Sequence, residues 1–290
     1  MKVGGLKCRL PDSWLTACST DPSHFVSLTL PVPGDMPQGF SGGCSLSSRE
    51  AFSSNLLLTL MEDDDLALLQ PHLTRVELGR GQKLVVAGEP IEHIYFPEGG
   101  VATVVSTLPG SGSAEVGIFG RDGLSGFCAM MGAESSPYDT IVQVDGATGL
   151  RADTATLTEL TEQSPSLRSL LARYVQSFIV QLAHGIVCHV HHRIEARVAR
   201  WLLMCHDRID GDEIMLTHDF ISMMVGAQRT SITVSLHILE GVGMIRAQRG
   251  RVTITDREKL EDIAGEAYGL PEAEYRRLLG PLGKTAARPS

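Results

Sequence analysis

The sequence lacks the features that would place the protein among secreted, zinc-binding or disulfide-stapled chains. The N-terminus has no basic segment followed by an apolar one, and no apolar run reaches the roughly 18 residues of a membrane span. We therefore expect no membrane association and a cytoplasmic location. Six cysteines are scattered through the 290 residues without forming a Cys-x-x-C pair, which indicates reduced thiols rather than a zinc ribbon or a thioredoxin-type site: Cys8, Cys18, Cys44, Cys128, Cys188 and Cys205.

Catalytic arrangements are also missing from the sequence. No Ser-His-Asp arrangement, phosphate-binding loop or pair of catalytic carboxylates is evident. An enzyme of the cupin type needs clustered His and carboxylate ligands on its strands, whereas His93 stands alone in its extended segment. We therefore expect neither an enzyme nor a resident cofactor.

Acidic residues outnumber basic ones, which at first sight argues against a nucleic-acid partner. The formal net charge is −9 and the isoelectric point is about 5.6. Within residues 192–259, however, ten Arg and Lys residues stand against nine Asp and Glu residues. Because the local charge matters more for docking on DNA than the total does, DNA stays open as a partner.

The chain is long enough for two domains, each with its own core. Residues 1–52 are rich in Pro, Gly and Ser, which predicts a flexible extension. In residues 53–164, a Leu-rich helical pattern is followed by short extended segments separated by Gly-containing turns. This series is typical of a β-barrel or jelly roll, a fold that forms pockets. The expected strands cover residues 75–78, 83–86, 91–96, 101–106, 115–119, 140–144 and 148–152.

A long helix is predicted over residues 165–192, followed by a second helix over Glu195–His206. We expect the seam of the long helix to form a two-fold dimer interface, with packing on its own domain as the alternative. The seam has a 4,3 spacing and consists of Leu171, Val175, Phe178, Leu182, Gly185, His189 and His192, broadened by Tyr174, Ile179 and Ile186.

Residues 217–240 indicate two short amphipathic helices joined by a tight turn at Gly226. Thr217 can cap the first helix, and polar and basic side chains from Gln228 to Ser231 open the second. Two helices at a steep angle with such a start suit insertion into the DNA major groove. An ordinary core hairpin is the alternative interpretation.

The segment after these helices makes the DNA-binding interpretation more specific. Residues 244–246 and 252–255 are β-prone and flank a Gly-containing loop, which predicts a hairpin. Arg246, Arg249 and Arg251 lie near its tip, where their guanidinium groups could contact phosphates. The sequence therefore predicts a winged helix-turn-helix DNA-binding domain over residues 193–265.

The order of these parts resembles the Crp/Fnr superfamily of bacterial transcription regulators over roughly residues 55–265. Val225–Thr233 looks like the family's recognition turn V-G-x-x-R-x-[ST]-V, and Leu239–Ile245 looks like its exit to the wing. Gly88–Gly100 is similar to the hallmark of the family's roll. The resemblance implies an α+β fold with a cyclic-nucleotide-binding-like β-roll (53–164), a dimerisation helix (165–192), a winged helix-turn-helix (193–265) and a C-terminal tail (266–290).

The resemblance also implies a homodimer on palindromic double-stranded DNA, with RNA polymerase as a further partner. Arg229 matches the family arginine that reads a guanine, although a phosphate contact is the alternative. The next two base readers fall on Thr230 and Val234, so the operator should differ from the family consensus. The predicted DNA-binding residues are Thr217, Gln228, Arg229, Thr230, Ser231, Thr233, Val234, His237, Arg249 and Arg251.

The sensor positions depart from the cyclic-nucleotide pattern. Phe127 stands where the family has a glutamate, residues 134–140 contain no arginine, and Leu182 and Ala183 replace the usual hydroxyl side chains. A cyclic phosphate without a cation would be poorly compensated, so cAMP is not expected to bind and the effector is unknown.

A metal-, haem- or redox-responsive sensor is the alternative function. The closely spaced N-terminal cysteines of the family's oxygen sensors are missing, and Cys128 is interpreted as a small buried hydrophobe. His184, Cys188 and His192 are spaced four residues apart on one predicted helix face, a spacing that can bind a metal. Imidazoles placed near a helix C-terminus are the simpler explanation.

Overall fold

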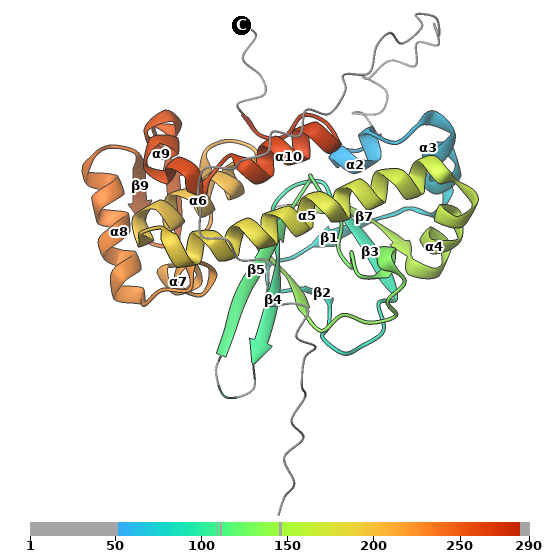
Figure 1. Cartoon of the computed structure of the whole chain (residues 1–290), viewed down its shortest axis with the longest axis horizontal. Coiled ribbons are helices and arrows are strands. Elements are labelled where there is room, and N and C mark those ends of the chain that lie inside the picture. Colours follow the sequence, from blue (N-terminus) through green and yellow to red (C-terminus); the bar gives the residue numbers. More distant parts are fainter. Residues whose placement is uncertain (1–51, 109, 111, 145–146, 285–290) are drawn as a thin grey trace, which may run out of the picture. The chain divides into compact units, whose positions relative to one another are not determined.

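The computed structural model describes residues 52–284 except 109, 111, 145 and 146. Almost all of the predicted N-terminal extension therefore lies outside the described residues, as do Cys8, Cys18 and Cys44. The described chain runs from short helices through a two-sheet roll and a long helix to a helical domain with a small sheet (Figure 1). This order confirms the predicted α+β fold class.

The roll consists of two antiparallel sheets, as its short segments and turns predict. Its core includes Ile94, Phe96, Val104 and Leu124, all with at most 1% of their surface exposed. One sheet has the order β2 (Lys83–Val85), β6 (Asp139–Val144), β4 (Val101–Leu108), β5 (Gly112–Phe119). The other has the order β1 (Thr74–Leu78), β7 (Ala147–Asp153), β3 (His93–Pro97).

Short helices flank the roll. Asn55 caps the first of them, because its Oδ1 accepts hydrogen bonds from the amides of Leu57 and Leu58. Its Nδ2 donates to the carbonyls of Pro97 and Gly123, which fixes this helix on the roll. The flanking elements are α2 (Leu56–Thr59), α3 (Asp63–Leu69), η2 (Gln70–His72), η3 (Ala129–Met131) and α4 (Thr154–Gln163).

Helix α5 (Pro165–His191) is the predicted long helix, but its apolar surface is divided in two. The seam residues Leu171, Val175 and Phe178 are buried in the core of the chain's own roll. The exposed stripe contains Ile179 and Ile186, which broadened the predicted seam, together with Val190; Ile186 and Val190 keep 68% and 70% of their surface accessible. The predicted seam was therefore wrong as a dimer surface over its first half, because periodicity does not identify the partner.

Helix α5 contains no uninterrupted apolar run of 18 residues, yet among the described helices it alone could cross a membrane. By length and composition it could, since its most apolar 18-residue window has a mean hydropathy of 1.2. Such a test is also passed by core helices, and 39% of this window is buried. The packing of Leu171, Tyr174 and Phe178 on the roll accounts for much of its apolar character.

The domain that follows α5 has its own core around Trp201, Leu202, Ile221, Ile232 and Leu239. Its small sheet has the order β8, β10, β9, and β8 was not predicted because it has only two residues. The elements are α6 (Ile194–His206), β8 (Glu213–Ile214), α7 (His218–Val225), α8 (Arg229–Gly241), β9 (Ile245–Gln248), β10 (Arg251–Ile254) and α9 (Arg257–Ala264).

The expected C-terminal tail contains further structure. Residues Gly265–Ala267 form the 3-10 helix η4, and α10 (Leu270–Leu278) packs along α5. Pro271 and Tyr275 of α10 are buried, and the Tyr275 hydroxyl donates to the Asp122 carbonyl at 2.8 Å. The helix within this segment was not predicted, because α10 is short and charged residues interrupt its apolar positions.

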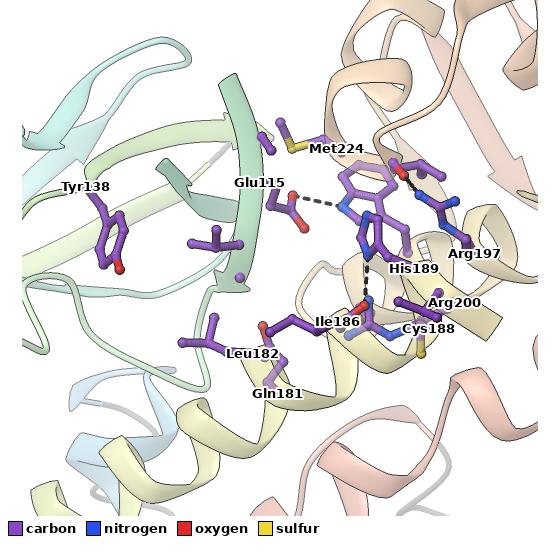
Figure 2. A pocket seen from close by; sticks show the side chains of 18 of the residues that line it. Glu115, Tyr138, Gln181, Leu182, Ile186, Cys188, His189, Arg197, Arg200 and Met224 are labelled. Carbon is purple, nitrogen blue, oxygen red and sulfur yellow. Dashed lines mark hydrogen bonds between the residues drawn. The ribbon is translucent and has the colours of Figure 1, made fainter. Parts of the chain in front are cut away.

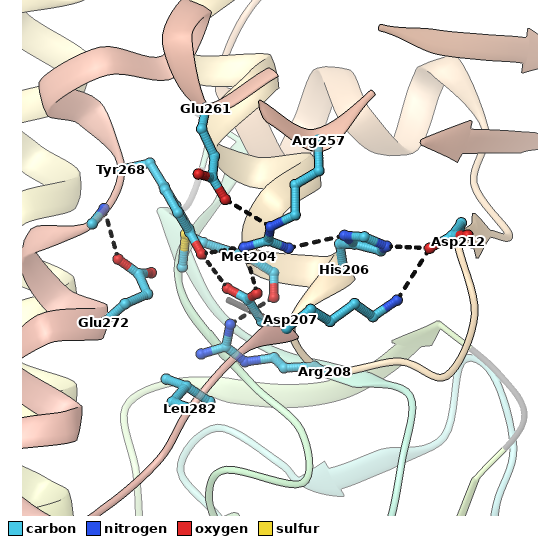
Figure 3. A network of polar contacts seen from close by, with 12 residues as sticks. Met204, His206, Asp207, Arg208, Asp212, Arg257, Glu261, Tyr268, Glu272 and Leu282 are labelled. Carbon is cyan, nitrogen blue, oxygen red and sulfur yellow. Dashed lines mark hydrogen bonds and ion pairs between the residues drawn. The ribbon is translucent and has the colours of Figure 1, made fainter. Parts of the chain in front are cut away.

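A polar network joins α6, α9 and the C-terminal segment (Figure 3). Arg257 donates to Asp207 at 2.8 Å and to the Tyr268 hydroxyl at 2.7 Å, and it also contacts His206 and Glu261. The Tyr268 hydroxyl in turn donates to Asp207 at 2.6 Å. We call this set the Asp207–Arg257 network.

Candidate nucleic-acid interface

The first helix of the helix-turn-helix begins as its sequence predicts. The Thr217 Oγ1 accepts a hydrogen bond from the Phe220 amide at 3.2 Å, which satisfies one of the otherwise unpaired amides at the start of α7. Phe220, Ile221 and Met224 are buried. The inner face of α7 is therefore fixed in the domain core.

Gly226 makes the turn between α7 and α8. Its backbone is left-handed, with φ 62° and ψ 47°. A Cβ at this position would also lie 3.3 Å from Nε2 of His189 and 3.6 Å from Nη2 of Arg197. Glycine is thus favoured here by its backbone conformation and by the close approach of two side chains.

Helix α8 separates a buried face from an exposed one. Ile232, Leu236 and Leu239 pack into the core, whereas Val234 keeps 57% of its surface accessible. Thr230 and His237 are also exposed, and they lie on the Val234 side of the helix. This outward face carries the side chains that a major groove would meet.

The predicted DNA-binding residues at the start of α8 differ in how exposed they are. Gln228, Arg229 and Thr230 are exposed, whereas Ser231 and Thr233 are half-buried. The Thr233 hydroxyl donates to the Arg229 carbonyl at 3.0 Å and lies 3.1 Å from Nδ1 of His218. Thr233 therefore already uses its hydroxyl within the fold.

The wing is the hairpin of β9 and β10, turned by Gly250 with φ 81°. Arg246 and Arg249 are exposed and form no ion pair with any residue that the structure describes. Arg251 instead pairs with Glu213 of β8 at 2.6 Å and donates to the Gln248 side chain at 2.6 Å. Sequence spacing could not reveal this partner, because β8 was not predicted.

A hollow of about 430 Å³ lies between α8 and the wing. It is lined by four of the predicted residues, Thr217, Arg229, His237 and Arg249, which come from three separate elements. The Glu240 side chain accepts a hydrogen bond from the Ala247 amide at 2.9 Å, which ties the wing to α8.

The candidate metal ligands are not brought together. His184 Nε2 lies 3.0 Å from the Ala267 carbonyl, and the Cys188 thiol donates to the same oxygen at 3.5 Å. His192 lies beyond the last residue of α5 in extended backbone. Across the described residues, no group of three or more His, Cys, Asp or Glu side chains could hold a metal ion.

A second cavity, of about 430 Å³, lies where β5, α5, α6 and α7 meet, and we call it the junction cavity (Figure 2). Phe127, Tyr138 and Leu182 of the predicted sensor region line it. The Phe127 ring packs on Phe178 with 4.8 Å between centroids.

Glu115 stands in the wall of the junction cavity and accepts a hydrogen bond from Trp201 Nε1 at 3.1 Å. Burial raises the pKa of this carboxyl to about 7, against the smaller lowering effects of Trp201, Arg200 and Arg208. Glu115, Arg197 and Arg200 were not predicted as site residues, because they come from different elements and match no spacing motif.

Comparisons with known proteins agree with this geometry. The Crp-like helix-turn-helix domain matches residues 196–263. A CRP-like cAMP-activated global transcriptional regulator of Mycobacterium tuberculosis is 28% identical over 213 residues, covering 69% of this chain and 92% of the relative.

Two solved structures share the fold. A CRP-family transcriptional regulator from Thermus thermophilus has a TM-score of 0.56 at 21% identity, covering 68% of this chain and 98% of its own. FixK2 from Bradyrhizobium japonicum has a TM-score of 0.57 at 14% identity, covering 68% and 99%. These two structures support the fold alone. The matched Crp-like helix-turn-helix domain and the curated relative, which is a transcriptional regulator, support assignment of the chain to the Crp/Fnr superfamily of DNA-binding transcription regulators.

Proposed function

We propose that this regulator acts in the cytoplasm as a homodimer, on an operator with two-fold symmetry, and that its effector is not cAMP. The observation that carries the proposal is the hollow that gathers Thr217, Arg229, His237 and Arg249 beside the exposed face of α8. Thr230 and Val234 lie on that face, while Gln228 and Ser231 flank its start. Arg229 would read a guanine, and Arg249 would contact phosphate.

Dimerisation is supported by the exposed stripe of α5. Ile179, Ile186 and Val190 follow a 7,4 spacing and are 45%, 68% and 70% exposed. A partner helix would cover such a stripe in a coiled-coil arrangement. A two-fold dimer would then present two copies of α8 to paired half-sites.

The proposal against cAMP is supported by the sensor region. Phe127 occupies the position of the family's glutamate and packs on Phe178, and no arginine of the roll lines the junction cavity. The relative from Mycobacterium tuberculosis is cAMP-activated, so the two proteins would share a DNA-binding mode and differ in their signal.

The domain limits proposed are 53–164 for the roll, 165–192 for the dimerisation helix and 193–265 for the DNA-binding domain. RNA polymerase is proposed as the partner through which regulation occurs. We assign no catalytic role to the roll, since the relatives are transcriptional regulators.

Selection of binding sites from random DNA tests the proposal. The full chain should recover a two-fold symmetric site with a fixed guanine in each half. Arg229→Ala should lose that guanine, at a cost of about 1–3 kcal/mol per half-site, and keep salt-sensitive binding. Ile186→Asp should behave as a monomer in sedimentation and recover half-sites weakly. A symmetric site with its guanine recovered by both variants would contradict the proposal.

A further inference from the structure

The wall of the junction cavity contains a largely buried arginine, Arg200. Arg200 of α6 lines the cavity with only 9% of its surface exposed, yet it forms no hydrogen bond or salt bridge with the residues that the structure describes. A buried charge of this kind is costly unless an opposite charge compensates it. The arrangement therefore points to a group that is not part of the chain.

Arg197, one turn earlier on α6, adds a second cation to the same wall. Its Nη2 donates to the Val225 carbonyl, while its Nε is buried without a hydrogen-bond partner among the described residues. Burial lowers the pKa of Arg197, which indicates that its charge is poorly compensated. His189 of α5 lies beside it (Figure 2).

Glu115 supplies little negative charge to balance these groups. It is the one acidic residue in the described wall of the cavity, and its carboxyl is engaged by Trp201. With a pKa of about 7, it is largely protonated at mildly acidic pH and about half protonated at neutral pH. The polar end of the cavity is therefore positive.

The rest of the wall is apolar. Phe127, Leu182 and Ile186 face the cavity from the roll and from α5, and Met204 and Met224 face it from the helices of the DNA-binding domain. A volume of about 430 Å³ lies within the range of small-molecule sites. A suitable ligand would have one anionic end and an apolar body.

We propose that the junction cavity binds a small amphipathic carboxylate, with its anionic end on Arg200 and Arg197 and its apolar body between β5 and α5. The two guanidinium groups supply the donors that a carboxylate accepts. The charged end is built by α6 of the DNA-binding domain, not by the roll.

The site would connect the ligand to DNA binding. Arg197 holds the Val225 carbonyl and lies 3.5 Å from that of Gly226, at the turn leading into α8. A carboxylate that attracts Arg197 competes with these contacts. This coupling between the ligand and DNA binding rests on the proposed function, whereas binding of the carboxylate in the junction cavity does not.

Calorimetric titration of the full chain with decanoate, without DNA, tests the site. Decanoate should bind once per chain, and decanol, which has the same body without the charge, should bind at least about tenfold more weakly. Arg200→Gln should weaken decanoate binding about 10- to 100-fold, the range expected for lost charge-assisted hydrogen bonds. Arg173→Gln, on an exposed part of α5, should leave it unchanged.

Several outcomes of this titration would overturn the proposal. They are no decanoate binding by the wild type, equal binding of decanoate and decanol, or unchanged binding by Arg200→Gln. A folded Arg200→Gln variant is verified by its circular dichroism and melting curve. cAMP in a parallel titration is expected not to bind.

DNA binding is measured separately. Decanoate should change the affinity of the wild type for its selected site and leave that of Arg200→Gln unchanged. Decanoate binding without any effect on DNA would overturn the coupling and keep the site. Failure of DNA binding both with and without decanoate would count against the proposed function alone.

Discussion

Arg200 and Arg208 are both at least nine-tenths buried and lie eight residues apart in the sequence. They differ in their hydrogen-bond and ion-pair partners. Arg208 donates two hydrogen bonds to Asp122, at 2.9 and 2.6 Å, and a third to the Met204 carbonyl at 2.6 Å. Arg200, on the side of the junction cavity, has no such partner among the described residues. The charge of Arg208 is compensated by Asp122 of the same chain, whereas Arg200 is placed to bind the carboxylate of the proposed ligand.

Replacement of each arginine by methionine should give the largest contrast. Arg208→Met leaves Asp122 buried and unpaired, which we expect to lower the free energy of unfolding by about 3–5 kcal/mol. Arg200→Met removes a charge that forms no hydrogen bond or salt bridge with the described residues, and should be neutral or stabilising. Urea denaturation of both variants measures the free energy of unfolding. Equal losses in the two variants would show that Arg200 and Arg208 contribute alike to stability.

The pH dependence of stability should sharpen the comparison next. The folded-state pKa of Glu115 is about 7, above the ordinary value of 4.5 for a glutamate, so the folded state keeps a proton that the unfolded state releases first. Stability should therefore fall as pH rises from about 4.5 to 7 and then level off.

Glu115→Gln should remove this fall, which is on the order of 1 kcal/mol because the side chain keeps some access to water. Unfolding measured at pH 5 and pH 7 for both proteins provides the test. In Arg200→Met the fall should extend to higher pH, since Arg200 lowers the pKa of Glu115. If the free energy of unfolding of the wild type and of Glu115→Gln changed with pH in parallel, the Glu115 carboxyl would not hold a proton in the folded state as proposed.

Two tyrosine hydroxyls should give the smallest contrast. Tyr268→Phe removes a hydroxyl that donates to Asp207 and accepts from Arg257, and should cost about 1 kcal/mol. Tyr138→Phe, in the wall of the junction cavity, should be nearly neutral. The melting temperatures of the two variants provide the comparison. A larger decrease for Tyr138→Phe than for Tyr268→Phe would show that the Tyr138 hydroxyl contributes more to stability.

The sequence predicted those features whose signal is local. The roll strands and the two helices around Gly226 follow from periodicity and turn residues, and Thr217 caps α7 as predicted. The partners of charged side chains could not be predicted, since Asp122 and Arg208 are 86 residues apart. The same limit explains why Arg251 was predicted as a phosphate contact although it pairs with Glu213.

Helix α5 illustrates a further limit. Its apolar residues occur on more than one face, so spacing alone could not assign Leu171 and Phe178 to the roll and Ile186 and Val190 to the exposed stripe. The arginines of the junction cavity were missed because a missing partner leaves no pattern in the sequence.

The Asp207–Arg257 network also has a consequence for the order of folding during synthesis. The last member of the network in the sequence is Tyr268. Further along the chain, Tyr275 donates to the backbone carbonyl of Asp122, whose side chain pairs with Arg208. The roll can emerge from the ribosome and fold well before these residues are translated. Closure of the network therefore waits for Tyr268, and attachment of α10 to the roll waits for Tyr275. A nascent chain stalled after residue 265 would hold a formed roll without either contact.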